Sequence, residues 1–384
     1  MSIINDDLKY VSNTYARFPI AIVKGKGSLC YDEDGKEYID LGSGIAVNAF
    51  GYSDEEWVSA VTCQLGKVQH TSNLYYTEPC VSLAKLLCEK TGAKKVFFGN
   101  SGAEANECAI KIARKYAEDK GITGAKIVTL NNSFHGRTLA TLAATGQDVF
   151  HKSFLPLPEG FCHIDAGDAE AFKKLCEEEN IAAIMMEMVQ GEGGVMPLSK
   201  DFVTEVYKIA KEKDILVMVD EVQTGNGRCG ALYAYMNYGI EPDVVTTAKG
   251  LGGGLPIGCC MMFEKTENVL KAGDHGSTFG GNPVAAAGAV SVIERMTDEL
   301  FREVSEKSEM IFNAFNNAKG VKSISGMGLM IGIETEKDAS EVIAECREKG
   351  VLVIKAKNKV RLLPPLNIKK EELKKAIDVI ISSL

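Results

Sequence analysis

The chain has 384 residues, which at about 150 residues per domain suggests two domains and allows three. Apolar residues make up 45% and charged residues 25%, values typical of a globular protein with a large core, so a disordered chain is excluded. The formal net charge of −9 argues against nucleic acid or an anionic membrane surface as a partner.

Cysteine usage and the chain start indicate the compartment. Eleven cysteines, an odd number without any C-x-x-C pair, predict free thiols in a reducing cytoplasm rather than a disulfide framework. The start MSIINDDLKY is acidic and has no apolar stretch of the kind found in signal peptides, and no apolar run reaches the roughly 18 residues of a membrane span. The five histidines lack metal-ligand spacing. We therefore expect a cytoplasmic protein without a metal site.

The first elements in chain order are a hairpin and then a series of strands and helices. Residues 28–40 (SLCYDEDGKEYID) predict a hairpin with an Asp-Gly turn. Strand-like apolar runs follow at Lys95–Gly99, Lys126–Leu130, Ala182–Val189, Ile215–Val219 and Val244–Thr246. Helical patterns lie between them, at about 103–117 and 200–212. Continuous apolar strands separated by helices predict a mainly parallel sheet with helices on both faces.

The last hundred residues follow a different pattern. From about residue 286 a long helical pattern precedes strand-like runs at 328–333, 351–354 and 360–363, and a final helix. We therefore expect an α/β fold in three parts. Residues 1–45 form an N-terminal segment that packs with the small domain, 46–285 a large α/β domain, and 286–384 a small α+β domain.

Polar residues follow several of the predicted strands, where ligands of open α/β sheets bind. After 95–99 come Ser101, Gly102 and Ala103 at a helix start, whose free N–H groups suit a phosphate; an ordinary Ser N-cap would have the same sequence. After 126–130 come Phe134 and Arg137, which suit a planar ring and a carboxylate. Ordinary surface polarity with one anchoring aromatic is the alternative.

Two charged residues end buried strands. Asp220 is poorly solvated there and needs a positive or hydrogen-bond-donating partner, unless it only caps a following helix. Lys249 lies between small residues, where burial would lower its pKa and make its amine nucleophilic, unless the amine reaches the surface. The pattern Gly225-x-Gly227-x-x-Gly230 matches a dinucleotide fingerprint, but Asp220 and Glu221 would face the pyrophosphate, so we reject that interpretation.

Taken together, an anion site, an aromatic platform, a buried acid and a buried lysine are what pyridoxal 5'-phosphate (PLP) requires. Six motifs resemble those of the class III (ω-amino) aminotransferases of PLP fold type I. They are NSGAEANE (100–107), SFHGRT (133–138), QGEGGV (190–195), DEVQTGNGR (220–228), TTAKGLGGGLPIG (246–258) and HGSTFGGNP (275–283). Within the class, GIAVNAFG (44–51) and HTSNLYYTEP (70–79) resemble acetylornithine aminotransferases most.

The resemblance implies a role for each matching residue. For the cofactor, Lys249 matches the Schiff-base lysine, and Asp220 matches the partner of the pyridine nitrogen. Gln223 matches the residue on the O3′ side of the ring, and Phe134 and Val222 match the residues on either side of it. The phosphate site is matched by Ser101, Gly102 and Ala103. Thr278 matches a residue that reaches the neighbouring subunit's cofactor, which implies a homodimer with shared active sites. For the substrate, Arg137 and Ser277 match contacts, Arg361 the arginine that binds the α-carboxylate, and Glu192 the acid that shields it.

The implied reaction converts N2-acetyl-L-ornithine and 2-oxoglutarate to N-acetyl-L-glutamate 5-semialdehyde and L-glutamate, a step of arginine biosynthesis. Succinylornithine, ornithine and 4-aminobutyrate are alternative amino donors, because pocket shape sets the acyl group and chain length. An aminomutase or a decarboxylase on the same fold is a further alternative of a different reaction class.

Overall fold

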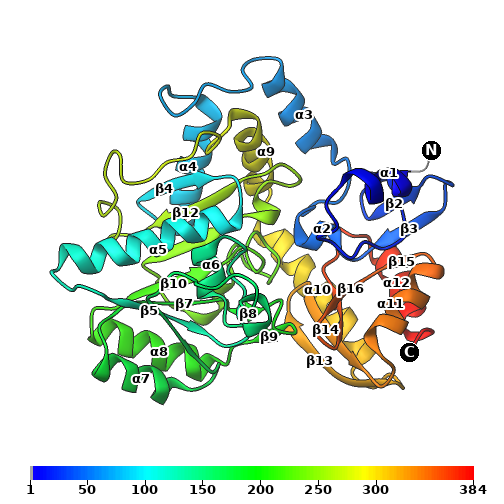
Figure 1. Cartoon of the computed structure of the whole chain (residues 1–384). Coiled ribbons are helices and arrows are strands. Elements are labelled where there is room, and N and C mark those ends of the chain that lie inside the picture. Colours follow the sequence, from blue (N-terminus) through cyan, green and yellow to red (C-terminus); the bar gives the residue numbers. More distant parts are fainter. Residues whose placement is uncertain (1–2) are drawn as a thin grey trace.

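The computed structural model describes residues 3–384. Its centre is a seven-stranded sheet in the order β4-β12-β11-β10-β7-β5-β6 (Figure 1). Its strands are β4 (Lys95–Gly99), β5 (Lys126–Leu130), β6 (Phe161–Ile164), β7 (Ile181–Met186), β10 (Leu216–Asp220), β11 (Val244–Thr247) and β12 (Gly258–Met262). Only β12 runs antiparallel to its neighbours. The predicted mainly parallel α/β sheet is therefore confirmed.

Helices cover both faces of this sheet, as the continuous apolar strands predicted. Leu216 and Met218 of β10 pack in one core cluster with residues of α5 (Gly102–Asp119). Val217 and Val219 point the other way and pack in a second cluster with residues of α8 (Lys200–Glu212). Successive side chains of a strand point to opposite faces, so burial on both faces requires the apolar run found in the sequence. The remaining elements of this part are α6 (Leu139–Ala144), α7 (Ala169–Glu178), and the short 3-10 helices η1 (Asp148–Phe150), η2 (Ala234–Tyr238) and η3 (Lys249–Leu251).

One predicted strand extends past the end of the observed strand. The run Ala182–Val189 was expected to be a single strand, but β7 stops at Met186, and β8 (Val189–Gln190) pairs instead with β9 (Met196–Pro197). Glu187 interrupts the run because its carboxylate accepts a hydrogen bond from the backbone N–H of Phe134, 2.9 Å away, in a neighbouring loop. Sequence patterns did not predict β6 or β12.

The N-terminal strands join the C-terminal part of the chain. β1 (Ile22–Lys26), β2 (Leu29–Asp32), β3 (Glu37–Asp40) and β15 (Val351–Leu352) form one four-stranded sheet. The predicted Asp-Gly turn joins β2 and β3. Four helices accompany this segment and the entry to the large sheet: α1 (Ile3–Tyr10), α2 (Ser43–Ala46), α3 (Glu55–Leu65) and α4 (Glu78–Thr91).

The C-terminal part is a smaller α+β unit. Its sheet has the order β13-β14-β17-β16, with β13 (Val321–Met327), β14 (Met330–Thr335), β16 (Ile354–Ala356) and β17 (Lys359–Leu362). Its helices are α10 (Asp298–Phe315), α11 (Ala339–Glu348) and α12 (Lys370–Ile381). The proposed boundary at residue 286 falls inside α9 (Pro283–Glu294), which packs against α3 and α4. We keep the three-part division as a proposal, because all seven strands of the large sheet lie between residues 46 and 285.

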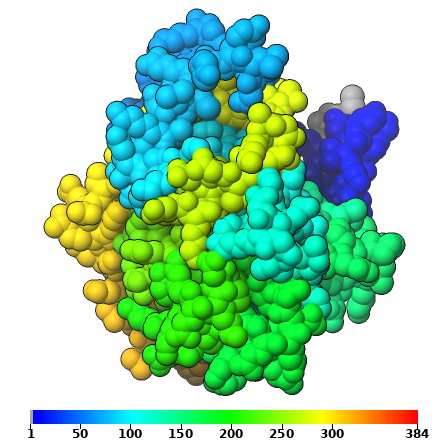
Figure 2. All heavy atoms as spheres, turned by 90° about the vertical axis from the view of Figure 1, so that its left-hand side faces the viewer, coloured from blue at the N-terminus to red at the C-terminus, as the bar shows by residue number. Residues whose placement is uncertain are grey.

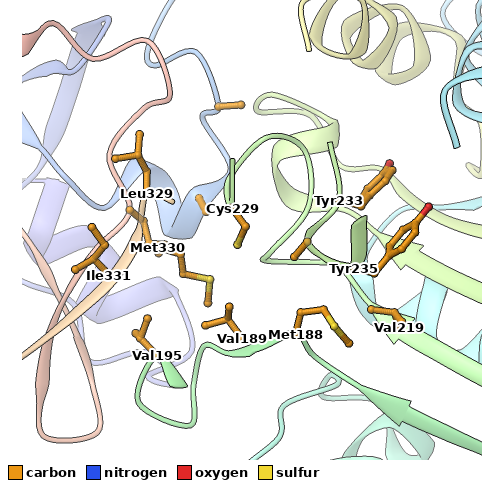
Figure 3. Packing of buried hydrophobic residues seen from close by; sticks show 14 of the residues in the cluster. Met188, Val189, Val195, Val219, Cys229, Tyr233, Tyr235, Leu329, Met330 and Ile331 are labelled. Carbon is orange, nitrogen blue, oxygen red and sulfur yellow. The ribbon is translucent and has the colours of Figure 1, made fainter. Parts of the chain in front are cut away.

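An apolar core joins the large sheet to the smaller one. Figure 3 shows part of it, with Val219 and Met188 on one side and Leu329 and Met330 on the other. Each of the eleven cysteines is unpaired. Within residues 3–384, no helix is long and apolar enough to cross a membrane.

Candidate active site

A cavity of about 460 Å³ opens beside the carboxyl ends of β4, β10 and β11. Of the residues predicted from sequence, Ser101, Gly102, Ala103, Phe134, Arg137, Asp220, Val222, Gln223 and Lys249 line it. The structure thus brings together residues that are far apart in the sequence. Glu192, Ser277, Thr278 and Arg361 do not line this cavity.

The start of α5 forms one wall of the cavity. Ser101 is the N-cap, and its Oγ accepts a hydrogen bond from the N–H of Glu104, 3.2 Å away. Glu104 in turn accepts one from the N–H of Asn100, which completes a capping interaction. The N–H groups of Gly102 and Ala103 have no acceptor within the helix and, with the helix dipole, suit an anion. Gly102 is required here, because a Cβ would lie 2.7 Å from Cγ1 of Val222.

Asp220 is held in place by three donors. Its Oδ2 accepts hydrogen bonds from Nδ2 of Asn106 and Nδ1 of His135, both at 2.8 Å, and its Oδ1 accepts one from the N–H of Val222 at 3.0 Å. Asp220 is 3% exposed, so these bonds replace lost hydration. Burial would lower the pKa of His135, but the hydrogen bond to Asp220 and the nearby negative charges raise it above its usual value. The cluster therefore favours a charged imidazolium against a carboxylate that faces the cavity.

Lys249 follows β11 at the start of η3 and lines the same cavity. Its φ of 45° lies in the left-handed region, which costs about 1 kcal/mol or more for a residue other than glycine. Burial lowers the pKa of Lys249 below its usual value; the positive charge of Arg361 acts in the same direction, and carboxylates including Glu192 oppose it. A larger share of its amine is therefore neutral and nucleophilic than in an exposed lysine.

The loop after β5 carries the aromatic residue and the cation. Phe134 lies edge-to-face with Phe150, their ring centroids 5.8 Å apart, and the guanidinium of Arg137 lies over the Phe150 ring at 4.3 Å. Oε2 of Glu187 accepts the N–H of Phe134 and anchors this loop to the end of β7. Burial raises the pKa of Glu187 to about 8.

Arg361 and Glu192 meet next to the cavity. Nη1 of Arg361 lies 2.6 Å from Oε1 of Glu192 and 3.2 Å from Oε1 of Gln223, which lines the cavity. Arg361 is buried, whereas the Glu192 side chain is 31% exposed and has room to move toward solvent. The expected pairing of these two residues is present in the structure.

Ser277 and Thr278 lie in the segment before α9. Oγ of Ser277 accepts a hydrogen bond from Nδ2 of the cavity residue Asn100, 3.0 Å away. Thr278 is exposed on the surface. A single chain therefore leaves the Thr278 hydroxyl outside its own cavity.

Among the cavity residues to which the sequence assigned no role are Asn106, His135 and Glu187. His135 directly follows Phe134 in the motif SFHGRT. Asn106 reads as one more polar position of an amphipathic helix, and Glu187 as an interruption of an apolar strand. Within residues 3–384 no group of His, Cys, Asp and Glu side chains is arranged to hold a metal ion.

The cavity fits PLP by its donor set. It offers helix N–H groups for a phosphate, Phe134 and Val222 beside the space for a ring, a buried acid fixed by three donors, and an amine of lowered pKa. A side chain at Gly102 would not fit beside Val222, so the close approach of these two cavity residues requires a glycine.

Comparison with known proteins agrees with this arrangement. The family model "Aminotransferase class-III" matches residues 10–384. An acetylornithine aminotransferase of Haemophilus ducreyi is 48% identical over 98% of this chain and 97% of its own. The structure of N-acetylornithine aminotransferase from Stenotrophomonas maltophilia has a TM-score of 0.86 at 33% identity, covering 99% of this chain and 98% of the other.

A structure of the Toxoplasma gondii ornithine aminotransferase, described with partial occupancy of PLP at its active site, has a TM-score of 0.93 at 32% identity. It covers 99% of this chain and 93% of the other. With the family model spanning nearly the whole chain and the cavity built from the family's own motifs, this protein belongs to the class III aminotransferases.

Proposed function

We propose that the chain is a PLP-dependent aminotransferase that converts N2-acetyl-L-ornithine and 2-oxoglutarate to N-acetyl-L-glutamate 5-semialdehyde and L-glutamate. The observation that carries the proposal is the pairing of Arg361 with Glu192 beside the Lys249 cavity, 2.6 Å apart. Such a pair lets one site accept both an ω-amine and an α-amino acid. The 48% identity to an acetylornithine aminotransferase supports this amino donor.

The residues of the cavity divide the binding of PLP among them. When bound, the cofactor serves as the electron sink for the carbanion formed at the substrate carbon. The N–H groups of Gly102 and Ala103, with Ser101, would bind the phosphate, and Phe134 and Val222 would contact the ring. Asp220 would keep the ring nitrogen protonated, while His135 and Asn106 hold Asp220 in position.

Lys249 supplies the base. With the cofactor bound, its Nζ would be the base that takes the proton from the substrate carbon bearing the amino group. The lowered pKa of Lys249 increases the share of neutral amine available for this role. Gln223 contacts both the cavity and Arg361, and so connects the cofactor site to the carboxylate site.

Arg361 and Glu192 sort the two substrates. A guanidinium binds a carboxylate with two parallel hydrogen bonds, which suits the α-carboxylate of glutamate and 2-oxoglutarate. With Glu192 in contact, the charge of Arg361 is neutralised, and acetylornithine binds with its far amine toward Lys249. Arg137 and Ser277 complete the substrate contacts.

We further propose a homodimer with shared active sites, in the cytoplasm. Large apolar side chains are exposed in α3, in the connection from α3 to α4 and in the segment before α9, among them Leu65, Leu74, Tyr76 and Phe279. Figure 2 shows the face on which these parts of the chain lie. A partner would cover them and would place Thr278 at the neighbouring cofactor. The eleven unpaired thiols suit a reducing compartment.

The test is a panel of amines with 2-oxoglutarate, followed by glutamate formation. We expect the highest kcat/KM for N2-acetylornithine. A higher value for succinylornithine, ornithine or 4-aminobutyrate would reassign the amino donor. Consumption of the amine without 2-oxoglutarate would instead indicate an aminomutase or a decarboxylase.

A further inference from the structure

Arg228 is a buried cation whose charge the proposed reaction does not use. It is 2% exposed, and within the described residues no carboxylate forms an ion pair with it. Its Nη1 donates to the carbonyl oxygens of Leu329 at 3.1 Å and Pro364 at 2.5 Å, and its Nε has no partner among residues 3–384. Burial lowers the pKa of Arg228 to about 10. An apolar side chain of similar volume would avoid this desolvation cost, so stability alone does not explain an arginine here.

The two carbonyl groups belong to the smaller sheet and its extension. Leu329 lies in the turn between β13 and β14, and Pro364 follows β17, three residues after Arg361. The backbone carbonyl of Arg228 also accepts the N–H of Leu329, 2.9 Å away. The approach is so close that a Cβ on Gly328, whose φ is 57°, would lie 2.5 Å from the Arg228 carbonyl oxygen. Arg228 therefore binds this part of the smaller sheet through both side chain and backbone.

Along the chain, Arg228 is connected to residues that line the cavity. It ends the motif DEVQTGNGR, which begins with Asp220 and contains Gln223. Gln223 contacts Arg361 at 3.2 Å, so this one segment touches the β17 stretch at two points, beside Arg361 and at Pro364. Cys229, the next residue, is in the core that joins the two sheets (Figure 3).

We infer that Arg228 is a positioning residue that fixes Arg361 relative to Asp220 and Lys249, and thereby sets how tightly the site binds a substrate carboxylate. The inference rests on the proposed function, since it assigns Arg361 to carboxylate binding. Two hydrogen bonds from one planar group to two separate carbonyls hold the strand at a fixed distance and angle. Without them Arg361 keeps its chemistry but loses its position.

The test measures binding rather than turnover. Arg228→Met removes the charge and the donors at similar size, and Arg228→Lys keeps the charge and reaches at most one carbonyl. Lys307→Met is the control: Lys307 is also buried and donates to the carbonyl of Leu366 in the same stretch, but it comes from α10 and also pairs with Glu303. Calorimetry gives the affinity of each holoenzyme for glutarate, a dicarboxylate without a reacting group, and absorbance gives its affinity for PLP.

We expect Arg228→Met to weaken glutarate binding about tenfold, about 1.4 kcal/mol, with PLP affinity within about twofold of the wild type. The glutarate affinity of Arg228→Lys should lie between those of the wild type and Arg228→Met. Lys307→Met should lower the melting temperature without a change in glutarate affinity. Wild-type glutarate affinity in Arg228→Met would overturn the inference. An equal loss in Lys307→Met would do the same.

If Arg228→Met does not fold, Arg228→Lys decides, and wild-type affinity there also overturns the inference. If the wild-type holoenzyme itself neither binds glutarate nor transaminates glutamate, the proposed function fails and the inference fails with it. That outcome differs from a failure of the inference alone, in which the wild type binds glutarate and the variants bind it equally well.

Discussion

At the scale of single residues, Lys249 differs from the other lysines by its place and not by burial alone. Lys359 is also buried, with its pKa lowered by burial, but it donates to Ser325 and lies off the cavity. We predict that borohydride reduction of the yellow holoenzyme attaches the cofactor to Lys249 and leaves Lys359 unlabelled. Peptide mass mapping reads out the site. Label on any other lysine would exclude Lys249 as the cofactor-binding residue.

Asp220 has a charge-dependent role. Asp220→Asn preserves the shape but cannot hold the ring nitrogen protonated, and it removes the negative charge beside Nδ1 of His135. Breaking a buried ion pair costs roughly 3–5 kcal/mol, so we expect turnover to fall by about 10²–10⁴ with the cofactor still bound.

Asp243→Asn is the control for this change. Asp243 is equally buried at 4% exposure, but it pairs with Lys211 away from the cavity. This variant should lose stability and keep turnover. Near-normal turnover in Asp220→Asn would contradict the assigned role.

The raised pKa of Glu187 predicts that the free energy of unfolding depends on pH. Burial raises its pKa in the folded protein to about 8, from an ordinary 4.5. The folded state therefore holds this proton more tightly than the unfolded state, and the associated stability is lost as pH rises between about 4.5 and 8. Glu187→Gln keeps an acceptor for the Phe134 N–H but does not titrate. The urea concentration at the unfolding midpoint should therefore drop more between pH 5.5 and pH 8 in the wild type than in Glu187→Gln. An equal drop in both proteins would contradict the prediction.

At the scale of elements, we call the pair of Glu192 and Arg361 the gate, because it selects between the two substrates. Glu192 lies on the connection between β8 and β9, and Arg361 lies on β17. Glu192→Ala leaves Arg361 with only the neutral oxygen of Gln223, so its charge is no longer neutralised. The bare guanidinium should favour glutamate and should draw acetylornithine into the wrong orientation.

We predict that kcat/KM for the glutamate half-reaction rises relative to that for acetylornithine by one to two decades, about 1.4–2.7 kcal/mol. Single-turnover absorbance measurements follow each half-reaction separately. If both slow equally, Glu192 has a structural role and there is no gate.

Periodicity predicted the elements well where local signals were strong. The strands at 95–99 and 126–130 have the predicted bounds, because each is a short apolar run between turn residues. The prediction for the run 182–189 was wrong beyond Met186, because a single Glu within an otherwise apolar run does not by itself predict the end of a strand. In the structure Glu187, directly after the strand end, accepts a hydrogen bond from the N–H of Phe134, 53 residues away in sequence. The antiparallel strand β12 is equally apolar, and no local signal marks its direction.

At the scale of the whole molecule, Thr278 and the cavity of its own chain are separate, which predicts complementation between subunits. Thr278→Ala chains lack the donated hydroxyl and Lys249→Ala chains lack the base. In a mixed dimer, one site carries both changes and the other carries neither. The intact site should regain wild-type-like activity after subunit exchange. Exchange proven by a mass-tagged subunit, with no gain over either parent, would count against a shared site.

Sequence alone predicted the chemistry that we propose for this protein. The residues proposed to bind the phosphate and the ring, together with Asp220 and Lys249, occur at strand ends in short contiguous motifs, so local patterns sufficed to propose them. Local patterns also predicted the mainly parallel sheet, because parallel strands are covered on both faces and must therefore be apolar throughout.

Only the tertiary structure decided which side chains hold these residues in place. His135, Asn106 and Glu187 act through contacts 29 to 114 residues away in sequence, such as the bond between Asn106 and Asp220. The same is true of Arg228, whose carbonyl partners are 101 and 136 residues distant. Local composition carries no record of such pairings, because a hydrogen bond depends on distances that the packing of the two sheets sets.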